Sequence, residues 1–311
     1  MFVNDLQKYL VEEYLEHYQE GQINRREALH QITLILGSAA LADRLMAEHE
    51  AKAAPSKPSI FSPKPTPAQT QPGVTVPPDD PDIQVADVKI PAQGFTLFGY
   101  LATPKKNLPA PGILVDHENR GLVEHIKDVA RRAAKAGYVA LAPDLASRAG
   151  GTQSFANPAD VTGVLGQITP DQIVSDLSLA LDYLRKLPEV QAEKLGATGF
   201  CYGGGTTWRI VTKRADLRAV VPFYGPNPPI EDVKNIKAAC LGIYAGNDTR
   251  INSGIPALEA AFKAANVTYE IMIYPNVNHA FHNDTGQSYN EIAAKDAWAK
   301  TLAWFQKYLR G

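Results

Sequence analysis

Residues 194–208 read Lys-Leu-Gly-Ala-Thr-Gly-Phe-Cys-Tyr-Gly-Gly-Gly-Thr-Thr-Trp, which is a strand pattern that runs into a glycine-rich turn and then a helix. Cys201 stands between Gly199 and Gly203, the spacing of a nucleophile elbow with cysteine in place of serine. The pattern predicts that Cys201 is exposed at the carboxyl end of a sheet, where a helix N-terminus helps to stabilise a thiolate. The alternative is a buried cysteine whose neighbouring glycines serve only the turn.

Outward from this turn, apolar runs alternate with amphipathic segments from residue 112 onward. Continuously apolar runs such as 113–115 and 219–221 are typical of parallel strands that are covered on both faces by helices. The two leading runs, separated by residues 92–94, favour an antiparallel hairpin at the edge. The fold class is therefore α/β, with a doubly wound, mostly parallel sheet and an antiparallel edge. We expect strands at 83–90, 95–103, 112–117, 138–143, 195–200, 219–224, 240–246 and 268–274. We expect helices at 123–136, 170–187, 204–213, 255–264 and 288–309.

A proline-rich stretch divides the chain at residues 55–82, and its composition favours an extended linker over a packed core. Before it, Asp5–Gln19 and Arg25–Glu50 have apolar residues at helical spacing, with Gly21 between them. We therefore predict a helical hairpin in residues 1–54 and a catalytic domain in residues 83–311. Such a hairpin offers a surface for self-association into a homo-oligomer.

The pair Arg25-Arg26, followed by an apolar stretch, also has the parts of a twin-arginine export signal. Against that interpretation, Asn24 and Glu27 have the spacing of a capping box, which explains the motif as a helix start. We favour a retained hairpin and a cytoplasmic location, with export as the alternative.

Composition excludes several classes of protein. The chain has 311 residues, 31 Lys and Arg against 33 Asp and Glu, and a formal charge of −2, which argues against binding nucleic acid through a basic surface. Two cysteines cannot form a disulfide framework. The longest uncharged apolar stretch, residues 32–42, is too short for a membrane span, which needs ~20 residues. We expect no transmembrane span.

Two polar residues follow later predicted strands. Asp248 ends the run Ile-Tyr-Ala-Gly-Asn-Asp, and His279 ends a loop after the last strand. The carboxyl ends of parallel strands share one edge, and nucleophile, acid and base follow each other in the chain order of α/β-hydrolases. We therefore predict that Cys201, Asp248 and His279 form a catalytic triad. Taken one at a time, Cys201 would be interpreted as a core cysteine, Asp248 as a turn residue and His279 as a surface histidine.

This triad predicts attack on an ester or lactone carbonyl. His279 accepts the thiol proton, and Asp248 fixes the imidazole tautomer. The oxyanion needs two donors, for which we expect the backbone N–H of Tyr202 and one from the loop at residues 117–121.

These motifs resemble the dienelactone hydrolase family over about residues 83–311. The resemblance is carried by Gly-Phe-Cys201-Tyr-Gly-Gly, the Glu118 loop, Ala142-Pro-Asp-Leu, Asn247-Asp248 and Asn278-His279-Ala-Phe281. It implies an α/β-hydrolase fold and a Cys, Asp and His triad. It also implies that Glu118 contacts the resting cysteine and exchanges partners when substrate binds, and that Asn119 supplies an oxyanion N–H.

The resemblance is incomplete where the substrate carboxylate would bind. Arg148 matches one of two expected arginines, but Asn283 occupies the position of the other. A dienelactone-type carboxylate should therefore bind weakly, although Arg120 could compensate. Phe281 could line the pocket and could equally be core.

The site is expected to need no metal and no cofactor, because the histidines near Glu118 and His279 are too sparse for a metal centre. We predict a hydrolase of a small-molecule carboxylic ester or lactone that acts through an acyl-enzyme. Two alternatives stay open: a thiol peptidase-like enzyme, which needs room for an extended peptide, and a binding protein without catalysis on the same scaffold.

Overall fold

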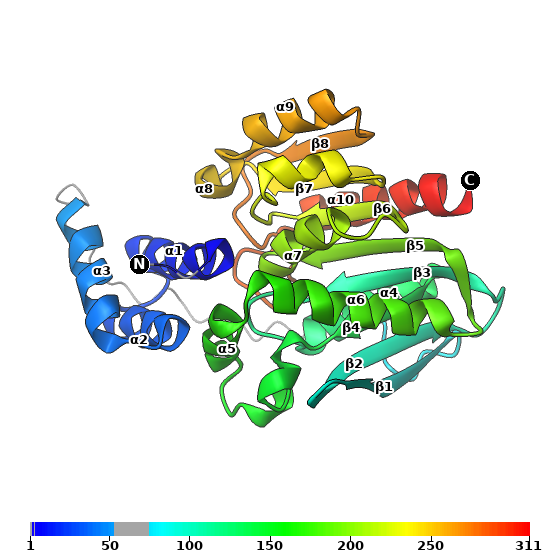
Figure 1. Cartoon of the computed structure of the whole chain (residues 1–311), viewed down its shortest axis with the longest axis horizontal. Helices are drawn as coiled ribbons and strands as arrows, with labels where there is room; N and C mark the ends of the chain where they lie inside the picture. Colours follow the sequence, from blue (N-terminus) through cyan, green and yellow to red (C-terminus); the bar gives the residue numbers. More distant parts are fainter. Residues whose placement is uncertain (1, 3, 53–74) are drawn as a thin grey trace.

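The computed structural model describes residues 2, 4–52 and 75–311 and contains one eight-stranded sheet in the order β1-β2-β4-β3-β5-β6-β7-β8 (Figure 1). The β1–β2 and β2–β4 pairs are antiparallel, and the remaining neighbours are parallel. The predicted α/β sheet with its antiparallel edge is confirmed. The strands are β1 (Ile83–Ala92), β2 (Phe95–Pro104), β3 (Ala110–Asp116), β4 (Val139–Pro143), β5 (Val190–Phe200), β6 (Leu217–Phe223), β7 (Ala239–Ala245) and β8 (Tyr269–Tyr274).

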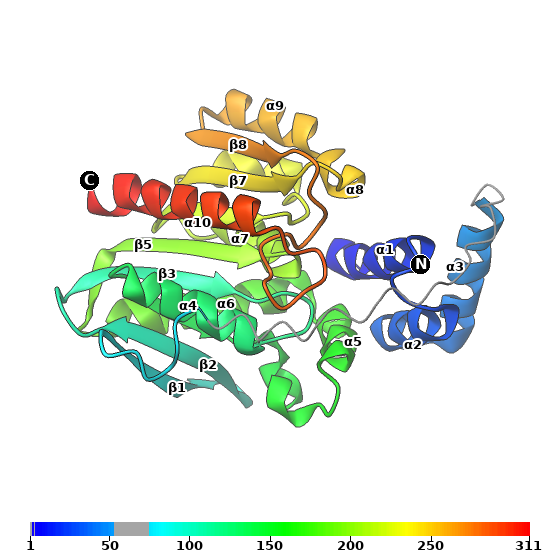
Figure 2. The same cartoon turned by 180° about the vertical axis from the view of Figure 1, so that it is seen from behind.

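Helices cover both faces of the sheet because the central strands are apolar on both sides. Every residue of β3 and β7 is buried. Helices α6 (Pro170–Lys186) and α7 (Tyr202–Val211) lie on one face, and α4 (Glu124–Lys135) and α10 (Glu291–Phe305) lie on the other (Figures 1 and 2). Helix α9 (Ile255–Ala265) precedes β8. All five predicted helices of this region are present.

The N-terminal region differs from the predicted hairpin, because it contains three helices: α1 (Asp5–Gln19), α2 (Arg25–Leu36) and α3 (Ala39–Lys52). The predicted helix over 25–50 is interrupted at Gly37, which has φ +65° and donates its N–H to the carbonyl of Thr33. Glycine adopts this left-handed conformation without strain and so ends helices readily. The Asn24 side chain caps α2, as the capping-box spacing predicted.

The sequence analysis missed one short helix, α5 (Val161–Gln167). It packs between the N-terminal helices and the sheet region. It contains Gly163 and Gly166, which weaken the helical pattern in the sequence. The structure uses both as close contacts with α2, since a Cβ on either would lie 2.7 Å from Leu34 or Ile35 side-chain atoms.

Helix α1 lies across the carboxyl ends of the central strands, between α5 and α8 (Thr249–Asn252) in both views (Figures 1 and 2). The side chain of Gln7 donates to the carbonyl of Gly166, and the hydroxyls of Tyr14 and Thr162 are 3.2 Å apart. The buried face of α1 therefore packs within its own chain. None of the helices in residues 4–52 and 75–311 has the length and apolarity needed to cross a bilayer.

Most of the predicted linker, residues 55–74, lies outside the described residues, and the chain after it is anchored to α4. The Asp128 carboxylate accepts hydrogen bonds from the backbone N–H groups of Thr75 and Val76 at 3.0 and 2.9 Å. The same fully buried carboxylate pairs with Arg131 and Arg132. The buried Asp128 carboxylate thus binds both Arg131 and Arg132 and the backbone at residues 75–76.

We predict that Asp128→Asn lowers the free energy of unfolding by about 3 kcal/mol, because it removes the only one of the two carboxylates paired with the buried Arg131 that is itself buried, Glu124 being half exposed. Urea denaturation measures the change. The matched control is Asp87→Asn, since Asp87 is exposed and 3.7 Å from Lys127, and it should change stability by less than about 0.5 kcal/mol. Equal effects in the two variants would contradict this assignment.

Candidate active site

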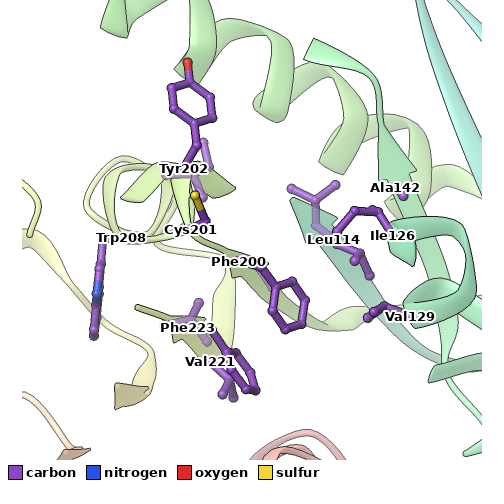
Figure 3. Packing of buried hydrophobic residues seen from close by; sticks show 14 of the residues in the cluster. Leu114, Ile126, Val129, Ala142, Phe200, Cys201, Tyr202, Trp208, Val221 and Phe223 are labelled. Atoms are coloured by element: carbon purple, nitrogen blue, oxygen red, sulfur yellow. The ribbon is translucent and has the colours of Figure 1, made fainter. Parts of the chain in front are cut away.

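Cys201 occupies a strained turn between β5 and α7. Its backbone has φ +58° and ψ −118°, a conformation that L-residues rarely adopt, and its N–H donates to the carbonyl of Phe223 at 3.1 Å. Phe200 and Tyr202 flank the cysteine with their rings directed away from each other (Figure 3). The turn therefore presents the sulfur at the N-terminus of α7.

Glycines make this turn possible, as the sequence spacing suggested. A Cβ on Gly199 would lie 2.2 Å from the carbonyl oxygen of Gly203, and a Cβ on Gly203 would lie 2.3 Å from that of Asp116. Both distances are far below van der Waals contact, so only glycine fits. The end of β3 is joined to α7 because the Asp116 carboxylate accepts from the hydroxyl of Thr207 at 2.9 Å.

The sequence analysis expected an exposed nucleophile, and this expectation was wrong for the structure as it stands. Cys201 is 3% exposed because α1 covers it. Its Sγ is 3.2 Å from the hydroxyl of Tyr9 and 3.4 Å from Oε1 of Glu13, and the thiol donates to this carboxylate. Neither α1 residue was foreseen, because their spacing of four residues on one helical face is also that of an ordinary core contact.

Asp248 and His279 lie at the same edge as Cys201. Nδ1 of His279 is 2.5 Å from Oδ2 of Asp248, whose other oxygen accepts from the backbone N–H of Ile251 and caps α8. Sγ of Cys201, a ring nitrogen of His279 and a carboxylate oxygen of Glu13 all lie within 4.8 Å of one another. Since Nδ1 is hydrogen-bonded to Asp248, Nε2 is the nitrogen left to act as a base. No residue in the described ranges forms a hydrogen bond with Nε2.

Burial, hydrogen bonds and neighbouring charges shift the pKa values of His279, Asp248 and Cys201. Burial favours neutral imidazole, but the hydrogen bond and charge of Asp248 outweigh it and raise the pKa of His279. Burial likewise favours protonated Asp248, yet its bond to His279 lowers the pKa of that carboxyl. Burial, reinforced by the charges of Glu13 and Glu118, raises the pKa of the Cys201 thiol well above its usual value. Cys201 is therefore a neutral thiol in this state.

Glu118 and Asn119 lie in the loop after β3, facing the elbow. Oε2 of Glu118 accepts from the side-chain amide of Asn283 at 2.5 Å, and burial raises the pKa of this carboxyl. Asn283, which stands where the family resemblance places an arginine, is thus engaged with Glu118. The Asn119 side chain donates to Glu13 at 3.1 Å, and the backbone N–H of Tyr202 hydrogen-bonds the Cys201 sulfur.

The three expected substrate-binding residues are placed differently. Arg148 forms a two-point ion pair with Asp176 and lies 4.1 Å from the centroid of the Phe95 ring. Arg120 is exposed within the loop after β3. Phe281 is fully buried and packs on the rings of Tyr224 and Tyr274. Among the described contacts, none joins these three side chains to Cys201, and their role in substrate binding stays a prediction.

A cysteine at a strained strand-to-helix turn, with an Asp–His pair at the same edge of a mostly parallel sheet, defines an α/β-hydrolase. The chain belongs to the dienelactone hydrolase family, which cleaves lactones and esters and whose sequence model matches residues 97–309.

Similar proteins agree with this assignment. A Methylorubrum extorquens protein described as "Putative carboxymethylenebutenolidase" is 36% identical over 257 residues, covering 79% of this chain and 87% of its own. The crystal structure of a dienelactone hydrolase candidate from Klebsiella pneumoniae is 33% identical, with a TM-score of 0.67 and coverage of 73% of this chain and 99% of its own. Pyrococcus horikoshii acylaminoacyl peptidase shares the fold at 16% identity and a TM-score of 0.58, covering 73% of this chain and 42% of its own.

We predict that Gly203→Ala disables the elbow. The added methyl group would displace α7 from β3, at a cost of roughly 1–3 kcal/mol, and would misplace Cys201 relative to His279. Thermal denaturation together with kcat/KM for p-nitrophenyl acetate measures both effects. Gly286→Ala is the control, because its Cβ would have ordinary contacts, the nearest atom being 3.4 Å away. If Gly203→Ala behaved like this control, the close approach would have no role.

Proposed function

We propose that this hydrolase cleaves a carboxylic ester or lactone with Cys201 as nucleophile, His279 as general base and acid, and Asp248 as the group that orients the imidazole. The observation that carries the proposal is the juxtaposition of a strained cysteine with an Asp–His pair: a ring nitrogen of His279 lies within 4.8 Å of Sγ of Cys201, and Nδ1 of His279 is hydrogen-bonded to Asp248. The family assignment supports it, since its members cleave lactones and esters.

The reaction divides into two acyl transfers. His279 Nε2 takes the thiol proton as Sγ forms a bond to the carbonyl carbon, and the carbonyl oxygen becomes an oxyanion. When this intermediate collapses, the carbon–oxygen ester bond breaks, and the imidazolium returns its proton to the leaving alkoxide. Water then attacks the thioester with His279 as base, the carbon–sulfur bond breaks, and the proton returns to the thiolate. With a lactone, the leaving alcohol stays in the same product molecule.

The oxyanion would be held by backbone donors at the helix N-terminus and the neighbouring loop. The Tyr202 N–H already points at the sulfur, and Asn119 supplies the second N–H in this proposal. Glu118, like Glu13, is a buried carboxylate whose charge disfavours the thiolate, and its release from that role on substrate binding would activate the thiol. Glu118 therefore acts on the thiol rather than on the substrate.

We predict that Cys201→Ala abolishes turnover of p-nitrophenyl acetate, whereas Cys240→Ala leaves it nearly intact. Cys240 is fully buried on β7, and burial alone raises the pKa of its thiol. Iodoacetamide should inactivate the unmodified enzyme and modify Cys201, as peptide mass spectrometry can show. Equal activity losses in the two variants would overturn the assignment of the nucleophile. A fully active Cys201→Ala enzyme would overturn the proposed mechanism.

We predict an acid limb in the pH dependence of kcat/KM that reports His279. Asp248 raises the pKa of His279, so the neutral base is lost as the pH falls through a value above 6.5. In Asp248→Asn this limb should move to lower pH, because the stabilising charge is gone. The value of kcat should also fall on the order of 10⁴-fold, because nothing holds the reactive imidazole tautomer. A limb that stays in place would mean that another group titrates.

A further inference from the structure

Helix α1 contacts the nucleophile directly. The hydroxyl of Tyr9 and Oε1 of Glu13 lie 3.2 and 3.4 Å from Sγ of Cys201, and Glu13 is itself 3% exposed. The second oxygen of Glu13 has no hydrogen-bond partner in the described part of the chain. A buried carboxylate from one end of the chain thus faces a thiol almost two hundred residues away in the sequence.

These contacts occupy the space that the reaction needs. An acyl carbon must come within about 3–3.5 Å of the attacking atom, and the oxygens of Tyr9 and Glu13 already lie at that distance. Oε1 of Glu13 also accepts from the side chain of Asn119, so its carboxylate spans the nucleophile and the proposed oxyanion loop. No ester carbonyl reaches Sγ while α1 stays in this position.

Polar contacts hold α1 in this closed state. Arg250 of α8 donates from Nε to Glu16 at 2.8 Å, and its guanidinium lies 4.8 Å from the centroid of the Tyr9 ring. Arg209 of α7 pairs with Asp5 at the start of α1. Both ion pairs are partly accessible to water, and such pairs are worth little enough to break without unfolding the chain.

We propose that α1 is a built-in gate over the active site, in which Glu13 is a positioning residue that keeps Cys201 as a protonated thiol and the Arg250–Glu16 pair is the latch. Substrate binds only when the latch opens and α1 leaves the sulfur. The proposal rests on the function proposed above insofar as Cys201 is the nucleophile. It adds a reason why this chain carries a helical segment before its hydrolase region.

The charges around the sulfur agree with this geometry. Burial and then the carboxylates of Glu13 and Glu118 raise the pKa of the Cys201 thiol, so removal of Glu13 favours the thiolate. The titratable groups that bear on Cys201 are Tyr9, Glu13 and Tyr14 of α1, Glu118 of the β3 loop, Tyr224 after β6 and His279 of the β8 loop, while Arg250 of α8 acts on Tyr9 and Glu13. Glu13 is the acid among them that moves away with α1.

The latch is tested in the full-length protein with Glu16→Gln. This change removes the charge that Arg250 binds and should raise the open fraction. We expect the rate of Cys201 alkylation by iodoacetamide and kcat/KM for p-nitrophenyl acetate to rise by a common factor of about ten, as an opening equilibrium requires. Glu12→Gln is the matched control on the same helix, since Glu12 pairs only with Lys8 among the described ion pairs, and both rates should stay unchanged.

The positioning role of Glu13 has its own readout. In Glu13→Gln the pH profile of Cys201 alkylation should shift to lower pH, because a neutral amide no longer disfavours the thiolate. Glu13→Asp keeps the charge and should keep the profile close to that of the unmodified protein. If the substitutions only loosened α1, both variants would change the rate of Cys201 alkylation, and their pH profiles would not differ from each other.

Hydrogen exchange tests the gate without any substitution. The group that iodoacetamide adds to Cys201 needs the space that Tyr9 and Glu13 occupy, so backbone amides of α1 should exchange faster after alkylation, while those of α6 should not. Unchanged protection of α1 would overturn the gate. The gate would also be overturned if the Glu16→Gln and Glu12→Gln variants had equal alkylation rates and equal kcat/KM values. Either result would leave the hydrolase mechanism standing if Cys201→Ala is inactive, whereas an active Cys201→Ala enzyme refutes the mechanism itself.

Discussion

The close backbone approach of β3, β5 and α7 is the constraint on which the site depends. Because Gly199 and Gly203 have no side chains, the first turn of α7 packs against the end of β3, and the chain passes through a positive φ at Cys201. This approach directs the sulfur toward the carboxyl edge of the sheet and toward the loop that carries Glu118. It also places the N–H of Tyr202 at the sulfur. The positions of the Cys201 sulfur, the Tyr202 N–H and the β3 loop therefore share one steric cause.

Around this turn the structure collects more negative than positive charge. Glu13, Glu118 and Asp248 are all buried near one histidine, with Arg250 behind them. Asp248 is compensated by His279, whereas Glu118, hydrogen-bonded to Asn283, and Glu13 each have one carboxylate oxygen without a hydrogen-bond partner among the described residues. Uncompensated buried charge is costly. The electrostatic arrangement therefore disfavours a thiolate in the closed state and would relax if α1 withdrew.

The position of α1 changes how the active site is understood. In a hydrolase without a covering segment, the elbow would present its nucleophile to solvent, but here the nucleophile is covered by a helix from the same chain. The helix is held by apolar side chains such as Leu6, Leu10 and Val11, which are buried along one face, and by ion pairs and side-chain hydrogen bonds. Such a contact can be specific and still separable, which is the property that a gate requires.

The sequence by itself determined the succession of strands and helices in the sheet region and the turn at Cys201, because those depend on local patterns: apolar runs, turn residues and the glycine spacing around Cys201. It also placed Asp248 and His279 after their strands, since parallel strands share one carboxyl edge. Only the tertiary structure decided that Arg148 pairs with Asp176 and that Tyr9 and Glu13 lie on Cys201. These contacts join residues far apart in the chain, and a helical face shows in sequence that it is buried but not against which partner. For Glu13, an acid on an apolar face, the partner is the nucleophile itself.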